Sequence, residues 1–325
     1  MPAPTSLHAM KSPKRATHSP AASPDALPPE VRPGQSVELL KQLHILTREG
    51  KLNQDSRRKL KQVYHLFQFI EKLLLELPAS DSGPTLADHG AGKSYLGFII
   101  YDLFFKALGQ GTIYGIETRS ELVESSKALA QKLGFERMRF LNVSVAESTQ
   151  SAELPEQIDV VTALHACDTA TDEALAKGVQ SGAPLILVSP CCHREVRPQL
   201  SVPEPLAGPL RHGIFRERHA EFATDALRAL LLEWAGYETR VFEFISTEHT
   251  GKNLMIAAIR RKTPGDTEAR ARAVAEFARF HGIVRQRLAE RLGFDLMHAA
   301  APAQGQVPVQ TPAAVQDPIP NPTVP

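Results

Sequence analysis

The chain has 325 residues, of which 42% are hydrophobic, and a formal net charge of +1. This length fits one catalytic domain with additions, and so small a net charge excludes a generic polyanion binder. Three cysteines without a C-x-x-C pair exclude a disulfide framework, and no run approaches the roughly 18 apolar residues of a membrane helix. We therefore expect a soluble protein of the reducing cytoplasm, with no membrane partner.

The two ends of the chain have a composition that is typical of disorder. Residues 1–35 are rich in Pro, Ala and Ser and lack aromatic residues, and residues 299–325 are rich in Pro, Ala, Val and Gln. The first segment has basic residues but no long apolar core, so it is not a secretory signal. We predict that both segments are disordered.

Residues 36–80 follow as a predicted helical segment. Leucines from Leu39 to Leu46 mark a short helix, and apolar residues at spacings of three and four from Val63 to Leu77 mark a long one, capped by Asp55 or Ser56. Its first turns carry four cations, which oppose the helix dipole. We interpret them as a patch that binds RNA or a ribosomal particle, or as an ordinary solvated face. These cations are Arg57, Arg58, Lys59 and Lys61.

The segment from Thr85 to Glu117 is the most informative part of the sequence. A short apolar strand enters a glycine-rich turn, a helix runs from Tyr95 to about Ala107, and a second strand ends at Glu117. This order predicts the first half of a nucleotide-binding Rossmann unit. Its glycines let the backbone approach a ligand, and the carboxylate is placed to accept hydrogen bonds from both ribose hydroxyls.

Three ligands fit such a turn to different degrees. A phosphate-binding P-loop requires a glycine where Ala87 stands, and Asp88 would place a negative charge in the phosphate cradle. A dinucleotide fingerprint requires its third glycine at Tyr95. S-adenosylmethionine carries no phosphate and has a cationic amino group that Asp88 can face. A plain glycine turn in an α/β protein remains the alternative to all three.

Strands and helices then alternate to the end of the predicted domain. We predict an α/β fold with a Rossmann-like, doubly wound, mostly parallel seven-stranded sheet over residues 81–262, preceded by the helical extension. A single C-terminal helix is predicted within residues 263–298. The later predicted strands are 138–144, 158–164, 184–189, 239–246 and 253–260, and the helices are 120–133, 171–180, one closed by Trp234, and 267–292.

From Thr85 to Arg260 the chain resembles a class I, Rossmann-fold S-adenosylmethionine-dependent methyltransferase. More narrowly, Leu164-His-Ala-Cys-Asp168 and Ser189-Pro-Cys-Cys-His193 resemble a sparsely characterised family of methyltransferase domains. The resemblance implies S-adenosyl-L-methionine as cofactor. It implies methionine contacts from Asp88, Gly90 and Gly92, ribose contacts from Glu117, adenine contacts from Ser144 and Val145, and a place near the methyl group for Leu164. Ser144 departs from the acidic residue usual there.

Ionisable residues and thiols follow the fourth and fifth predicted strands. His165, Cys167 and Asp168 follow one, and Cys191, Cys192 and His193 follow the other. Because parallel strands open on one crevice, we expect all three cysteines in one place. They can be buried structural thiols. The histidines can serve as a base that Asp168 orients, or Cys191 or Cys192 can be a nucleophile. A zinc site has suitable ligand types, but its spacing is unusual, and we predict no metal.

We predict a methyltransferase that acts on RNA. The cationic residues between Arg194 and His219, and the hairpin turn from Thr247 to Asn253, favour an anionic acceptor. The alternatives are a protein or small-molecule acceptor, and a catalytically silent module that binds the cofactor or RNA.

Overall fold

A computed structural model describes residues 28–78, 80–148, 151–164, 166–243, 253–263 and 265–297. The predicted disordered tail, 299–325, and most of the predicted N-terminal disordered segment lie outside these residues. Residues 28–35 form turns in which Val31 and Gln35 are buried, so the predicted disorder does not extend over them. The chain divides into two compact units, 1–61 and 62–325. Their boundary falls inside a helix, and each unit is described by itself.

The first unit contains helix α1 (Val37–Gln42) and the start of helix α2 (Gln54–Leu75). Ser36 caps α1, because its hydroxyl accepts a hydrogen bond from the backbone N–H of Leu39 at 3.2 Å. The prediction that Asp55 or Ser56 caps the long helix is wrong. The side chain of Asn53 accepts from the backbone N–H of Ser56 at 2.8 Å, and the helix begins at Gln54, before both predicted caps.

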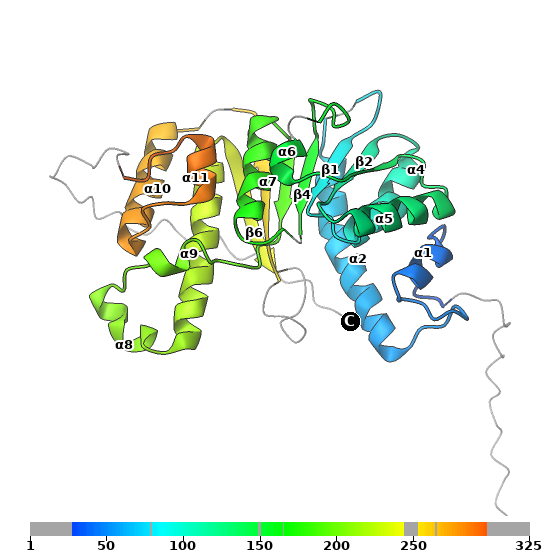
Figure 1. The fold of residues 1–325 in the computed structure, drawn as a ribbon, viewed down its shortest axis with the longest axis horizontal. Coiled ribbons are helices and arrows are strands. Elements are labelled where there is room, and N and C mark those ends of the chain that lie inside the picture. Colours follow the sequence, from blue (N-terminus) through cyan, green and yellow to red (C-terminus); the bar gives the residue numbers. More distant parts are fainter. Residues whose placement is uncertain are drawn as a thin grey trace, which may run out of the picture. The chain divides into compact units, whose positions relative to one another are not determined.

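The second unit contains a seven-stranded sheet within the described residues (Figure 1). The strand order is β3-β2-β1-β4-β5-β7-β6. The first five strands of the chain are parallel, and β7 runs antiparallel to both β5 and β6. This topology confirms the predicted fold class. The strands are β1 (Thr85–His89), β2 (Thr112–Ile116), β3 (Met138–Leu141), β4 (Val160–Ala163), β5 (Leu185–Val188), β6 (Tyr237–Glu243) and β7 (Leu254–Arg260).

The helix after β1 is not a regular α-helix throughout. It begins as α3 (Tyr95–Ile100), widens into a π-helical turn at Tyr101–Phe105 and ends as α4 (Lys106–Leu108). The other α-helices are α5 (Ser120–Leu133), α6 (Val145–Ser148), α7 (Thr169–Gln180), α8 (Ala207–Leu210), α9 (Gly213–Trp234), α10 (Thr267–His281) and α11 (Arg287–Leu292), with 3₁₀ turns at Arg197–Gln199 and Glu204–Leu206.

The prediction of one C-terminal helix is wrong, because α10 and α11 are separate. Gly282 has a φ of +71° and ends α10 in the left-handed conformation, with the N–H of Ile283 bonded to the carbonyl of Ala278. The side chain of Gln286 then accepts from the N–H of Ala289 and starts α11. Apolar residues continue at helical spacing through this break, so their pattern alone does not show it.

Helices cover both faces of the sheet. On one face, β-strand residues such as Val161 and Ile186 share a buried cluster with side chains of α7, α9, α10 and α11, and α9 to α11 lie together beside the β7 and β6 end (Figure 1). On the other face, Phe98 of α3 lies 5.9 Å from the ring of Phe140 in β3. Because both faces are covered, the carboxyl ends of the parallel strands are the natural place for a site.

None of the described helices is long and apolar enough to cross a membrane.

Candidate active site

The glycine-rich turn after β1 is held close to two neighbouring strand ends. Gly90 and Gly92 have φ angles of +65° and +58°, where side chains are strained, and a Cβ at Gly90 would lie 3.3 Å from the backbone of Ala166. The backbone N–H of Gly92 donates to Oε2 of Glu117 at 2.9 Å. The turn is therefore tied to the end of β2 and packed against the segment after β4.

Ser94 decides against a P-loop. Its side chain is only 1% exposed, and its Oγ lies 2.7 Å from the position that a Cβ would take at Gly97. The hydroxyl thus points into the protein interior between α3 and β2. A P-loop requires that hydroxyl to reach a magnesium ion beside the phosphates, and the buried Oγ cannot do so.

Glu117 is a strongly ionised carboxylate at the end of β2. Partial burial opposes ionisation, but hydrogen bonds from the side chain of Arg119 and from the backbone N–H groups of Arg119 and Gly92 outweigh it, and lower the pKa of Glu117 to about 2. Nε and Nη2 of Arg119 each donate to this carboxylate at 3.1 Å. The group therefore keeps its negative charge throughout the physiological range.

Asp88 lies in the buried end of β1, and its side chain is only 4% exposed. Burial raises its pKa to about 7, although the hydroxyl of Thr162 donates to Oδ1 at 2.8 Å and works in the opposite direction. Their surroundings thus give the two carboxyl groups different charges: Glu117 is ionised, and Asp88 is half neutral near pH 7.

A cavity of about 410 Å³ opens where the turn, β2, β3 and β4 meet, within the usual size range of small-molecule sites. The predicted cofactor residues in its wall are Gly90, Glu117, Ser144 and Val145. Asp88, Gly92 and Leu164 are not part of the wall. The lining residues are Gly90, Ile116, Glu117, Thr118, Arg119, Val143, Ser144, Val145, Ala166, Cys167, Thr169, Ala170 and Glu173. A larger cavity of about 610 Å³, between Ser148 and Lys177, holds none of the predicted residues.

Ser144 has a structural task at this cavity. Its backbone N–H donates to Oε2 of Glu147 at 3.0 Å, while its Oγ accepts from the backbone N–H of Glu147 at 3.2 Å. This reciprocal pair is a capping box, and it starts α6. The serine that departs from the usual acid is thereby explained locally, and its adenine contact stays a prediction.

The sheet brings the three cysteines together, as the order of the strands predicts. The Sγ atoms of Cys167 and Cys192 lie 2.7 Å apart, and that of Cys191 lies 3.8 Å from Cys167 and 3.7 Å from Cys192. All three belong to the described residues, and none forms a disulfide. Burial, with hydrogen bonds to the other two thiols, raises the pKa of Cys191 to about 12. A nucleophilic cysteine requires the opposite, a lowered pKa.

The carboxylate that orients His193 is Asp225, not Asp168. Nε2 of His193 lies 3.1 Å from Oδ2 of Asp225, which comes from α9, and the histidine is only 6% exposed. Oδ1 of Asp168 instead accepts from the backbone N–H of Arg194 at 3.0 Å. The predicted Asp168–histidine pair is therefore wrong for His193. His165 lies outside the described residues.

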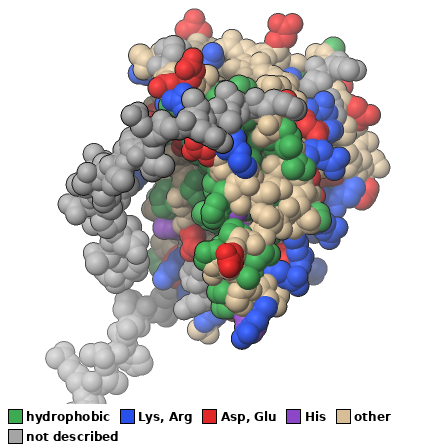
Figure 2. Space-filling view, turned by 90° about the vertical axis from the view of Figure 1, so that its left-hand side faces the viewer, with side chains coloured by type: hydrophobic (Ala, Val, Ile, Leu, Met, Phe, Trp, Pro, Cys, Tyr) green, Lys and Arg blue, Asp and Glu red, His purple; other side chains and the backbone are tan. Residues whose placement is uncertain are grey.

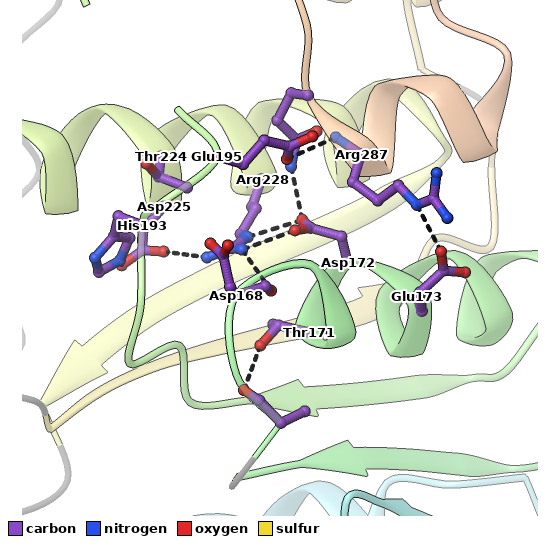
Figure 3. A network of polar contacts seen from close by, with 12 residues as sticks. Asp168, Thr171, Asp172, Glu173, His193, Glu195, Thr224, Asp225, Arg228 and Arg287 are labelled. Atoms are coloured by element: carbon purple, nitrogen blue, oxygen red, sulfur yellow. Dashed lines mark hydrogen bonds and ion pairs between the residues drawn. The ribbon is translucent and has the colours of Figure 1, made fainter. Parts of the chain in front are cut away.

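A network of buried ion pairs holds the loop after β4 and the loop after β5 in place (Figure 3). Arg228 of α9 is 1% exposed and donates to the two carboxylate oxygens of Asp172 at 2.9 and 2.8 Å, and to Oδ1 of Asp225 at 3.0 Å. Its Nη2 also donates to the carbonyl oxygen of Asp168 at 3.1 Å. Burial disfavours the charged guanidinium, but Asp172 and Asp225 outweigh it and raise the pKa of Arg228.

Asp225 and Arg228 were not among the residues predicted for the site. Their spacing of three residues puts them on one face of α9, which is the only local signal. The spacing does not show that this face of α9 contacts the loops after β4 and β5. The network thus joins residues of α9 and α7 to the segment that carries Cys167, and through His193 to the segment that carries Cys191 and Cys192.

Residues 58–199 match the model of a family described as a methyltransferase domain. The match covers less than half of the chain and indicates a methyltransferase domain within residues 58–199. This confirms the predicted class of enzyme, while the narrower resemblance based on Leu164–Asp168 and Ser189–His193 stays a prediction. No curated protein matches the chain.

Several solved structures are similar to this methyltransferase at low identity. Magnesium protoporphyrin IX methyltransferase from Synechocystis PCC 6803, with bound SAH, is 14% identical, covers 70% of this chain and 95% of its own, and has a TM-score of 0.39. Aeropyrum pernix fibrillarin, with natively bound S-adenosyl-L-methionine, is 17% identical, covers 61% of this chain and 76% of its own, and has a TM-score of 0.38. A Podospora anserina methyltransferase with bound SAH is 13% identical, covers 70% of this chain and 87% of its own, and has a TM-score of 0.41. Such values are too low to assign a substrate or a cofactor.

Proposed function

We propose that this protein transfers the methyl group of S-adenosyl-L-methionine to RNA. The cofactor part of the proposal is carried by one observation, the ionised Glu117 in the wall of the cavity at the carboxyl ends of the parallel strands. Its carboxylate can accept hydrogen bonds from both ribose hydroxyls when the side chain of Arg119, which is 60% exposed, moves away from its two oxygens. Glu173, the other acid of the wall, is paired with Arg287 and Arg291, and Arg119 is paired with Glu117. Arg119 is the one Lys or Arg among the lining residues, and its pairing with Glu117 disfavours the phosphates of ATP or NAD.

The remaining wall fits the other parts of the same ligand. Ile116, Val143 and Val145 offer apolar surface to an adenine ring, and Gly90 lets the backbone come close without a side chain. When bound, S-adenosyl-L-methionine supplies a methyl group on a positively charged sulfur. The protein's own residues hold the ligand and leave room for an acceptor beside Cys167, where in-line alignment provides most of the catalysis.

Calorimetric titration with S-adenosyl-L-methionine, ATP and NAD tests the cofactor. We expect binding of the first alone. Glu117→Gln removes the charge but keeps the shape, so the affinity should fall by about 10- to 100-fold, the value of a hydrogen bond to a charged group. Glu124→Gln is the matched control, because Glu124 is an exposed acid of α5 that pairs with Lys127, and it should bind like the wild type. Equal affinity of both variants, or binding of ATP, would contradict the assignment.

Two surfaces support RNA as acceptor. The first turns of α2 expose Arg57, Arg58, Lys59 and Lys61, although Arg57 pairs with Glu30 at 2.7 Å. On the side where α10 lies in Figure 1, hydrophobic side chains reach the surface among Lys and Arg (Figure 2). Phe222 and Phe280 are 60% and 59% exposed on α9 and α10. Aromatic faces beside cations are what proteins use to bind single-stranded nucleic acid.

Transfer of a tritiated methyl group tests the acceptor. Purified protein and labelled S-adenosyl-L-methionine are incubated with RNA, protein and small-molecule fractions of a cell extract, and label is expected in RNA. The double variant Lys59→Glu/Lys61→Glu should weaken RNA binding and reduce its salt dependence, with cofactor binding unchanged. Lys127→Glu, on α5, is the control. Label in protein or small molecules would make them the acceptor, and cofactor binding without any transfer would indicate a silent binding module.

A further inference from the structure

We propose, in place of the prediction of no metal made from the sequence, that Cys167, Cys191 and Cys192 bind one zinc ion at the edge of the cavity. These are all the cysteines of the chain, and they meet from two segments that follow different strands. Their Sγ atoms all lie within 4.8 Å of one another. Zinc is the common biological cation that prefers such a set of thiolates.

The distances between the sulfurs suit tetrahedral coordination. With Zn–S bonds of about 2.3 Å, two ligand sulfurs of a tetrahedron are about 3.8 Å apart. Cys191 already has this spacing, with 3.8 Å to Cys167 and 3.7 Å to Cys192. The 2.7 Å between Cys167 and Cys192 has to widen by about 1 Å, which rotation of one side chain can supply because Cys167 is exposed.

The two segments are fixed by contacts outside the cluster. Arg228 and Arg194 hold the main chain and side chain of Asp168, next to Cys167, and Asp225 holds His193, next to Cys192. Outer contacts of this kind orient metal ligands and raise affinity. The cluster is therefore presented by a rigid frame, although its spacing along the sequence resembles no common zinc motif.

The charge and coordination of the site follow from three thiolates. Binding of Zn²⁺ by three thiols releases three protons to the solvent and leaves a net charge of −1 at the site. Among the described residues, no fourth His, Cys, Asp or Glu atom joins the group. Three thiolates fill three of the four tetrahedral positions, and water or an acceptor group can take the fourth, as in zinc sites that act in catalysis. Cys167 lines the cavity, so the ion would lie beside the methyl donor, a consequence that rests on the proposed function.

Metal analysis of the full chain tests the site without any cofactor. Protein purified in the presence of a phosphine reductant and without chelator should contain about one zinc per chain. X-ray absorption should show three sulfurs at about 2.3 Å. Cobalt substitution should give the intense absorption of a thiolate-to-cobalt charge transfer. No zinc retained and none taken up by the reduced protein, or sulfur absent from the zinc environment, would overturn the proposal. A Cys167–Cys192 disulfide persisting in the reduced preparation would overturn it as well.

Three variants and a control separate metal binding from folding. Cys167→Ser, Cys191→Ser and Cys192→Ser should each lower the zinc content from about one to near zero, while Ser189→Ala, in the same segment, should keep it. If a serine variant fails to fold, the cobalt spectrum and the sulfur count of the wild-type protein still decide the question. Zinc content is read without S-adenosyl-L-methionine, so loss of cofactor binding in Glu117→Gln with zinc unchanged would leave this site intact.

Discussion

Asp88 makes the stability of the protein depend on pH in a way that can be calculated. Burial raises the pKa of its carboxyl from 3.8 to about 7. The unfolded chain therefore ionises this group earlier than the folded one, and folding loses stability as the pH rises from about 4 to 7. The full difference, about three pH units at 1.36 kcal/mol each, is about 4 kcal/mol and stays constant above pH 7.

The variant Asp88→Asn removes this dependence. Asparagine does not titrate, and its amide oxygen can still accept from Thr162. The buried amide N–H₂ costs about 1–3 kcal/mol, but this cost does not change with pH. We therefore expect the unfolding free energy of the variant, relative to the wild type, to rise by about 3 kcal/mol between pH 5 and pH 8.

Urea unfolding at pH 5, 6, 7 and 8 measures this difference. Asp81→Asn is the control, because Asp81 is exposed in the turn before β1, and its curve should run parallel to that of the wild type. The reasoning is refuted if the curves of Asp88→Asn and the wild type also stay parallel across this range.

Two further substitutions test the frame of the site. Arg228→Met leaves Asp172 and Asp225 buried without their cation and should lower the unfolding free energy by about 3–5 kcal/mol. The control Arg272→Met removes an exposed ion pair at 3.9 Å and should change the unfolding free energy by less than about 0.5 kcal/mol. Equal effects of the two variants in urea unfolding would show that the buried network does not stabilise the protein. Gly115→Ala places a Cβ 2.7 Å from the ring of Phe140 and should destabilise by about 1–3 kcal/mol. Gly208→Ala, with open space around it, should change the unfolding free energy in urea by little, and an equally small effect of Gly115→Ala would show that the ring of Phe140 can move.

Local pattern was enough to predict the sheet and the edge of it where the candidate site lies. Apolar runs mark each strand, and the glycines and Glu117 stand at strand ends, where a parallel sheet exposes them. The meeting of Cys167 with Cys191 and Cys192 follows from the same rule, because it requires only that β4 and β5 be neighbours.

Helix ends were harder, because they depend on single side chains. Asn53 rather than Asp55 caps α2, and Gly282 interrupts a stretch whose apolar spacing continues into α11. The spacing of apolar residues shows which face of a helix is apolar, but it does not show where one residue in the left-handed conformation ends the helix.

The sequence by itself determined the class of fold, the enzyme class and the strand ends that border the candidate site, because each depends on residues close together in the chain. Only the tertiary structure decided that Asp225 holds His193, that Arg228 joins α9 to α7, and that Asp88 is buried enough to be half neutral near pH 7. These facts depend on the direction and depth at which distant side chains meet. Hydrophobic spacing fixes which face of α9 turns inward, but the partner that this face finds is set by how the helices pack.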